Sequence, residues 1–198
     1  MNNTKSQDIA SATVTRCATE SNQMEAHGRY VAQCFDSDGQ LKWSEEFDNL
    51  VTTEGKNFLL DTVMIGTAGT GALASVNMFY RMAFIATNTA PVATMTYATP
   101  TYTEATSGVI ASRGSPAFSA SAGGVKSTSA AVSAAIVGTA TIYGVSIVVL
   151  NAAVVGNLGI VSDVATATAK LYSFGLFGSA KSVTSGDTLN VSYSTTLT

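Results

Sequence analysis

The sequence predicts a mainly β protein: an antiparallel β-sandwich or jelly-roll-like fold with one short helix and an extended N-terminal arm. Three observations support this prediction: an alternating hairpin pattern over residues 29–49, a helical stripe over residues 53–65, and short apolar runs separated by Gly and Ser after residue 107. Short strands at this spacing are typical of sandwiches rather than of α/β sheets. We expect an arm over residues 1–27 and a single domain over residues 28–198.

Residues 1–27 contain few large apolar side chains, namely Ile9, Val14 and Met24. Such a segment cannot bury enough surface to fold alone. Two interpretations stay open for it. The segment is either an arm that orders on a neighbouring subunit by adding to a strand edge, or a frayed terminus without a role.

The predicted hairpin over residues 29–49 has its turn at Asp36-Ser37-Asp38-Gly39, a composition that favours a tight reversal. Alternation places Tyr30, Ala32 and Cys34 on one face. We expect Trp43, the only tryptophan, to be a packing residue of this half-buried hairpin rather than a ligand platform. Glu45, Glu46 and Asp48 predict a solvated edge whose charges discourage pairing with other sheets.

The helix is predicted over residues 53–65. Thr52 or Thr53 can cap it through a side-chain hydroxyl, and Glu54 is favourable near the positive end of the helix dipole. Apolar residues then recur three and four apart, and Gly66 is a suitable end. The members of this stripe are Phe58, Leu59, Thr62 and Val63.

The middle of the chain predicts a loop over residues 67–77 and a buried strand over residues 78–86. Arg81 lies within that strand and needs a carboxylate or carbonyl partner, because a lone buried guanidinium is costly. Pro91 and Pro100 bracket a further loop and keep it out of a central strand.

The remainder predicts strands over residues 109–112, 117–121, 127–137, 139–150, 170–177 and 188–197. Alternation is clearest at the end, where Leu189, Val191 and Tyr193 share one face. Turns are expected at Gly178-Ser179 and at Ser185-Gly186-Asp187. Residues 151–169 predict a long loop, or a small helix around residues 161–167.

Charge is scarce. Charged residues make up 12% of the chain, compared with about a quarter in an average soluble domain. Such a surface gives little repulsion against self-association. The net charge of -3 argues against nucleic-acid binding, which needs a basic surface. Ten of the thirteen acidic residues and five of the ten basic residues lie in residues 1–61.

The sequence indicates neither secretion nor membrane insertion. The two cysteines, Cys17 and Cys34, are too few for a disulfide scaffold, and the N-terminus lacks the apolar segment of a signal peptide. The longest apolar run, residues 142–155, is shorter than the ~20 residues of a membrane helix. We therefore expect synthesis in the cytoplasm, free thiols and no membrane partner.

No catalytic or metal-binding pattern in the sequence is complete. His27 is the only histidine and lies at the end of the arm, so we expect it to be solvent-exposed rather than a catalytic base. It cannot complete a zinc site with Cys17 and Cys34. Two acidic side chains before Gly39 resemble the start of a calcium loop, but no Glu closes that loop.

Two further patterns fail in the same way. Gly66-x-x-Gly69-x-Gly71 lacks the Lys of a phosphate-binding loop. Glu45 and Glu46 point to opposite faces of a strand, so they do not form the carboxylate pair of a glycoside hydrolase. We expect no catalytic, cofactor-binding or metal-binding residues and no cofactor.

Two motifs carry a resemblance to a known family: NLVTTxGxNxLLD at residues 49–61 and SGDTLNVSY at residues 185–193. Together with the hairpin before them, they resemble the small structural proteins of tailed-bacteriophage virions, in the same order and near the same chain ends. The resemblance covers most of the chain from about residue 28 and is loose in the middle. There, the expected Trp-containing segment after Thr94-Met95 is replaced by Tyr97 and Tyr102.

The resemblance implies a structural, non-enzymatic virion component, because none of its motifs is catalytic. The expected role is that of a decoration or cement protein on the capsid exterior, made in the cytoplasm of the host bacterium. The expected partners are the major capsid protein and further copies of the chain, as a dimer or trimer. Two alternatives stay open: a tail or fibre protein that attaches to a host receptor, and a virion-associated glycan-cleaving enzyme.

Overall fold

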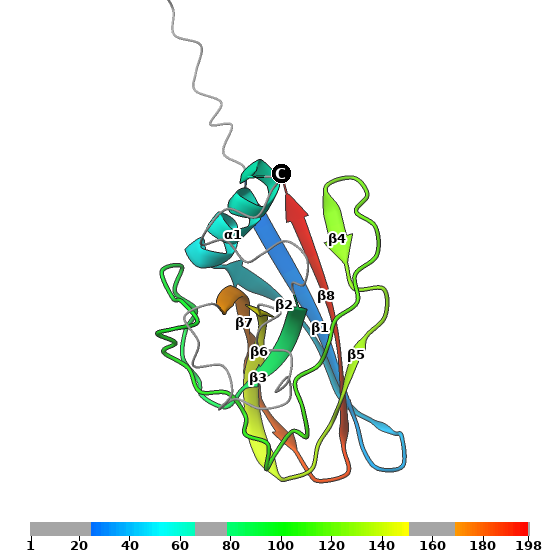
Figure 1. Cartoon of the computed structure of the whole chain (residues 1–198). Helices are drawn as coiled ribbons and strands as arrows, with labels where there is room; N and C mark the ends of the chain where they lie inside the picture. Colours follow the sequence, from blue (N-terminus) through cyan, green and yellow to red (C-terminus); the bar gives the residue numbers. More distant parts are fainter. Residues whose placement is uncertain (1–24, 66–78, 151–168, 198) are drawn as a thin grey trace, which may run out of the picture.

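The computed structural model describes residues 25–65, 79–150 and 169–197 (Figure 1). These residues form one helix and eight strands. The first part of the chain contains β1 (Ala26–Phe35), β2 (Leu41–Val51), α1 (Thr53–Ile65) and β3 (Phe79–Ile85). The second part contains β4 (Val125–Ser127), β5 (Val132–Ala135), β6 (Ala140–Leu150), β7 (Lys170–Val183) and β8 (Thr188–Leu197).

All eight strands belong to a single antiparallel sheet with the order β3-β6-β7-β2-β1-β8-β4. β4 and β5 both pair with the same edge of β8, at opposite ends of it. The sheet curls so that α1 lies across one end, while the β1–β2 and β7–β8 turns lie at the other (Figure 1). The predicted mainly β, antiparallel fold with one short helix is confirmed, as a curled single sheet; separate sandwich layers and jelly-roll connections are not confirmed.

The hairpin and its buried face match the prediction. Tyr30, Ala32 and Cys34 of β1 are fully buried, and the interposed residues are more exposed. At the turn, Asp36 Oδ1 accepts hydrogen bonds from the amides of Asp38 and Gln40, and Gly39 has a φ of 77°. The acidic side chain thus organises the turn itself.

Helix α1 begins where the sequence predicted, and Thr52 is the capping residue. The Gly55 amide donates to Thr52 Oγ1 at 3.0 Å, and the Lys56 amide donates to the Thr52 carbonyl at 2.9 Å. Glu54 does more than complement the helix dipole. Its Oε2 accepts the amides of Tyr97 and Leu171 at 2.9 and 2.8 Å, so Glu54 ties α1 to β7 and to the loop over residues 86–105.

The sheet is split between β2 and β7. These two strands pair only at Leu50 with Phe174 and at Val51 with Ser173. Beyond that point the gap is filled by aromatic rings: Phe177 contacts Phe47 and Trp43 edge-on, with ring centroids 4.9 and 5.5 Å apart. Trp43 is therefore a packing residue, as predicted, and the wedge of rings lies where the sheet opens.

The strands β3, β6 and β7 are buried on both faces over much of their length, which explains their continuous apolar runs. The inner face joins the main core. The outer face is covered by the loop over residues 86–105, whose Met95, Tyr97 and Tyr102 form a second buried cluster with Ile85 and Phe174. Within β3, Arg81 Nη1 donates to the Tyr80 carbonyl at 2.8 Å, which is the carbonyl partner that the sequence required.

An irregular segment joins the two edges of the curled sheet. Single bridges connect Met82 and Ile85 of β3 to Gly114 and Glu104, and another connects Ile110 to Ile136 beside β5. We call residues 104–114 the closing segment. Its side chains include a buried ion pair, in which Arg113 Nη2 lies 2.6 Å from Glu104 Oε2 and also donates to Tyr97 Oη at 2.8 Å.

Several predicted strand boundaries in the second half of the chain are wrong. Residues 109–112 and 117–121 form only isolated bridges. The predicted strand over residues 127–137 is instead the last residue of β4 and, after a break, β5 (Val132–Ala135). β7 continues to Val183, so Gly178-Ser179 is not a turn; the β7–β8 turn lies at Ser185-Gly186-Asp187, where Gly186 has a φ of 94°. The reason for the longer strand is its pairing with β6, which resumes from Ile142 to Ala140 after a bulge.

Other predictions fall outside the described residues. These are the arm up to residue 24, Cys17, the loop over residues 67–77 with its two glycines, the helix end at Gly66, and residues 151–168. At the end of the predicted arm, Ala26 and His27 belong to β1. Among the residues that the structure describes, none forms a helix with the length and apolarity needed to cross a bilayer.

Candidate functional site

His27, the only histidine, is exposed on β1. Its Nε2 lies 2.9 Å from Glu25 Oε2, and the two side chains are 65% and 59% exposed. This is the solvent-exposed environment that the sequence predicted. His27 is remote from Cys34, which lies near the other end of β1, and from Asp187, which contacts Cys34 from the β7–β8 turn.

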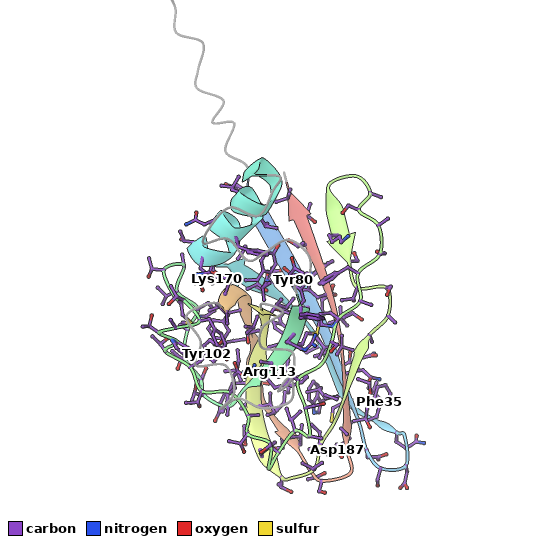
Figure 2. All side chains as sticks on the ribbon, viewed as in Figure 1. Phe35, Tyr80, Tyr102, Arg113, Lys170 and Asp187 are labelled. Carbon is purple, nitrogen blue, oxygen red and sulfur yellow. The ribbon has the colours of Figure 1, made fainter. Side chains whose placement is uncertain are left out.

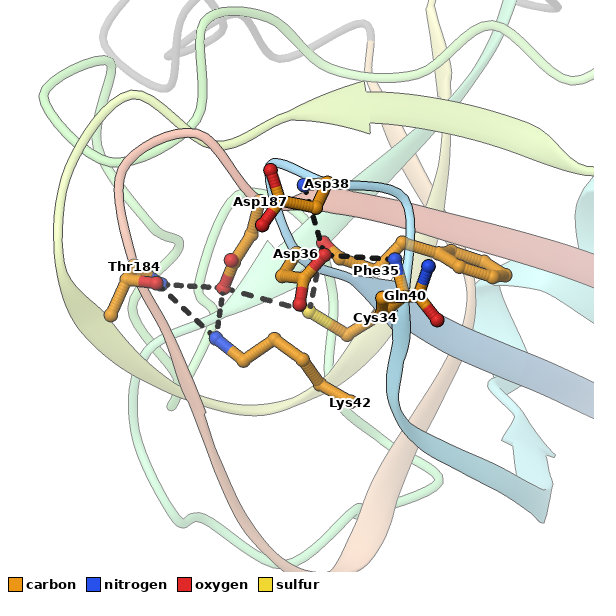
Figure 3. Close-up of polar contacts among 8 residues, drawn as sticks. All are labelled: Cys34, Phe35, Asp36, Asp38, Gln40, Lys42, Thr184 and Asp187. Atoms are coloured by element: carbon orange, nitrogen blue, oxygen red, sulfur yellow. Dashed lines mark hydrogen bonds and ion pairs between the residues drawn. The ribbon is translucent and has the colours of Figure 1, made fainter.

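Cys34 belongs to a polar cluster at the end of the sheet opposite α1, where the β1–β2 and β7–β8 turns lie side by side (Figure 3). The centre of this cluster is Asp187, whose side chain is 3% exposed. Its Oδ2 accepts hydrogen bonds from Lys42 Nζ at 2.5 Å, from the Thr184 amide at 2.7 Å and from Cys34 Sγ at 3.7 Å. The cluster therefore holds two turns together.

The pKa shifts in this cluster fit a role in holding the fold together. Burial and the neighbouring Asp187 raise the pKa of the Cys34 thiol to about 11, so the thiolate that a nucleophile needs is absent at neutral pH. Burial would raise the pKa of the Asp187 carboxyl, but hydrogen bonds from Lys42 and Thr184 outweigh it and lower that pKa below its usual value. Asp187 stays ionised and anchors Lys42.

Asp187→Asn is expected to lower stability in a pH-dependent way. A carboxyl whose pKa is lowered by folding adds stability above its unfolded pKa of about 3.9, and this stability is lost as pH falls through the folded pKa. The free energies of unfolding of the wild type and the variant should differ most near neutral pH and converge in acid. A difference that stays constant with pH would show that the Asp187 charge does not contribute.

The two adjacent glutamates lie on opposite faces of β2, as predicted, and each has a different basic partner. Glu45 Oε2 lies 2.6 Å from Lys181 Nζ, and the Gly178 amide donates to Glu45 Oε1. Glu46 Oε1 lies 2.9 Å from Arg29 Nε on the exposed face. The prediction of a solvated edge is wrong for Glu45, which is 18% exposed and bridges β2 to β7 across the split.

Metal chemistry finds no support in the described residues, which contain no group of three or more His, Cys, Asp or Glu side chains placed to hold an ion. Asp36 is engaged in its own turn. Among the pockets of the described residues, one is strongly apolar and lies at the α1 end of the curled sheet.

We call this site the aromatic pocket. It has a volume of about 340 Å³ and opens between α1, β8 and the hairpin that contains β4. Its apolar lining consists of Leu59, Tyr80, Phe118, Tyr172, Tyr193 and Leu197. Figure 2 shows Tyr80 beneath α1, at the opposite end of the sheet from Asp187.

The rings of the pocket contact one another edge-on in a row. Tyr80 lies at the middle, with ring centroids 5.3 Å from Phe118 and 6.4 Å from Tyr172, and Tyr172 lies 6.4 Å from Tyr193. Burial raises the pKa of Tyr80 to about 12 and also raises that of Tyr172. The phenols therefore stay neutral, and the pocket presents ring faces and edges that suit an apolar side chain.

The polar groups at the pocket form hydrogen bonds that join its walls to one another and to β1. Tyr172 Oη donates to Thr195 Oγ1 at 3.4 Å, and Thr195 Oγ1 in turn donates to the His27 carbonyl at 3.0 Å. Lys126, from β4, is the one charged residue among those that line the pocket. This arrangement can bind an apolar segment.

The pocket could not be recognised from the sequence, because its walls come from α1, β3, β7, β8 and the residues around β4. The two motifs singled out in the sequence do meet in the structure. Asn49 of the first donates through Nδ2 to Tyr193 Oη of the second at 3.3 Å. Each motif also supplies a pocket wall, through Leu59 and Tyr193.

Comparison with known proteins adds no relative: no family model, no curated protein and no solved structure matches this chain.

Proposed function

We propose that this protein is a structural component of a tailed-bacteriophage virion, a decoration or cement protein that binds the major capsid protein on the outside of the head. The observation that carries the proposal is the contact between Asn49 and Tyr193, because it joins the two motifs that resemble virion proteins. Residues far apart in the chain thus meet across β1, the strand that lies between β2 and β8.

The mechanism is burial of surface between subunits. A chain with 12% charged residues has little electrostatic repulsion to overcome when it packs against copies or partners. Binding of the assembled shell stabilises that shell by mass action, since a ligand favours the state that it binds. Self-association as a dimer or trimer would place several docking surfaces on neighbouring capsid subunits.

The two alternatives gain no support from the described residues. The loop proposed for receptor binding in a tail or fibre protein, residues 67–77, lies outside them. The carboxylates considered for glycan cleavage, Glu45 and Glu46, are held in separate ion pairs on opposite faces of β2.

The test is binding of the purified protein to phage particles that lack it. We expect saturable co-sedimentation with heads, and a rise in the temperature at which the heads release DNA. Deletion of residues 1–24, which leaves β1 intact, tests separately whether the N-terminal segment takes part in this binding. Attachment to tails alone, or hydrolysis of host polysaccharide, would contradict the proposal.

A further inference from the structure

The N-terminal segment enters the sheet beside the aromatic pocket. Ala26, the first residue of β1, is paired with Leu197 of β8, and Leu197 lines the pocket. The next residue of β1, His27, is also joined to the pocket lining. Its carbonyl accepts a hydrogen bond from Thr195 Oγ1, and Thr195 lines the pocket. Residues 1–24 therefore connect to the sheet one strand away from the pocket wall.

The chemistry of the two partners is complementary. The pocket offers a row of aromatic rings and two leucines, which bind aliphatic groups by area burial and dispersion. Residues 1–24 carry isolated aliphatic side chains, Ile9, Val14 and Met24, among polar residues. Such a segment has too little apolar surface to fold alone but enough to fill a pocket of this size.

We propose that residues 1–24 dock in the aromatic pocket of their own molecule, with aliphatic side chains against Tyr80, Phe118 and Tyr172. Extended at about 3.3 Å per residue, the segment reaches far beyond the ~4.8 Å that separates β1 from β8. A short tether also gives the segment a high effective concentration at the pocket, so its own copy outcompetes a segment from another molecule. This inference does not depend on the virion proposal.

The experiment uses Cys17 as a natural labelling site in the full chain. Cys34 is buried and its raised thiol pKa leaves it unreactive, so a nitroxide reagent at neutral pH labels Cys17 in the folded protein. We expect the spin label to broaden the amide resonances of Gly124, Lys126 and Leu197 at the pocket. The distant amides of Gly39 and Gly186 should stay sharp.

A mixed sample distinguishes docking within one molecule from docking between two molecules. Isotope-labelled Cys17→Ala protein is mixed with unlabelled protein that carries the nitroxide, so that only contacts between molecules broaden resonances. We expect no broadening at the pocket in this sample. Broadening in the mixed sample at the strength seen within one molecule would overturn the proposal in favour of a second copy, and no pocket broadening in either sample would overturn docking altogether.

A matched pair of variants tests the pocket itself. Ser121 lines the pocket from an exposed position, and the neighbouring Ala120 is exposed without lining it. Ser121→Trp is expected to fill the pocket and lower the broadening to the level that a flexible tether of about 16 Å produces, whereas Ala120→Trp should preserve the stronger broadening. Equal broadening in both variants would show that the segment does not dock in the pocket and would overturn the proposal.

Discussion

Replacing Arg113 by methionine is expected to lower the free energy of unfolding by about 3–5 kcal/mol, because it leaves the Glu104 carboxylate buried without its partner. The side chains of Arg113 and Glu104 are 4% and 6% exposed, and two hydrogen bonds from Arg113 reach Glu104 Oε2 at 2.9 and 2.6 Å. The pair lies in the closing segment that joins the edges of the curled sheet. Chemical denaturation monitored by circular dichroism measures the loss.

The double variant Arg113→Met with Glu104→Leu is the decisive control. Burial raises the pKa of Glu104 even against the attraction of Arg113, so desolvation offsets much of what the pair contributes. Removal of both charges should therefore restore most of the lost stability. Arg29→Met provides a surface reference, since its ion pair with Glu46 is half exposed and is worth about 0–1 kcal/mol. A double variant as unstable as Arg113→Met would contradict this account.

Gly55→Val is expected to cost about 3 kcal/mol, near the upper end for overpacking. A Cβ atom at Gly55 would collide with the backbone carbonyl of Tyr172 in β7, and backbone atoms cannot rotate away as a side chain can. The collision would push the start of α1 off the sheet and disturb the bonds that Glu54 makes to Tyr97 and Leu171. Thermal unfolding of the variant measures the effect.

Asn57→Val is the control for placing a β-branched residue in α1 without a clash. Asn57 is exposed on the same helix, so valine there should change stability by at most a few tenths of a kcal/mol. If the two variants show the same loss of thermal stability, the close packing of α1 on β7 is not the reason that position 55 requires glycine.

The parts of the fold that could be predicted from the sequence are those that local patterns determine. The buried face of Tyr30, Ala32 and Cys34 follows from strand alternation, and the bounds of α1 follow from the Thr52 cap and the apolar stripe. The strand at Leu189–Tyr193 was predicted for the same reason. In each case one side-chain period or one turn signal is complete within a short segment.

Long-range contacts account for what the sequence did not reveal. Glu45 looked like an edge charge, but the split between β2 and β7 gives it Lys181 as a partner 136 positions away, from a strand whose length depends on β6. The closing segment has no strand period, because isolated bridges hold it rather than a ladder. The aromatic pocket combines walls from five parts of the chain, and no single stretch displays it.

The number of copies per particle tests the central claim most directly. Quantitative mass spectrometry of purified virions should find this protein at a copy number comparable with that of the major capsid protein, because a decoration protein repeats with the capsid lattice. A ratio near that of the tail proteins, or the absence of this protein from purified particles, would contradict the proposed role.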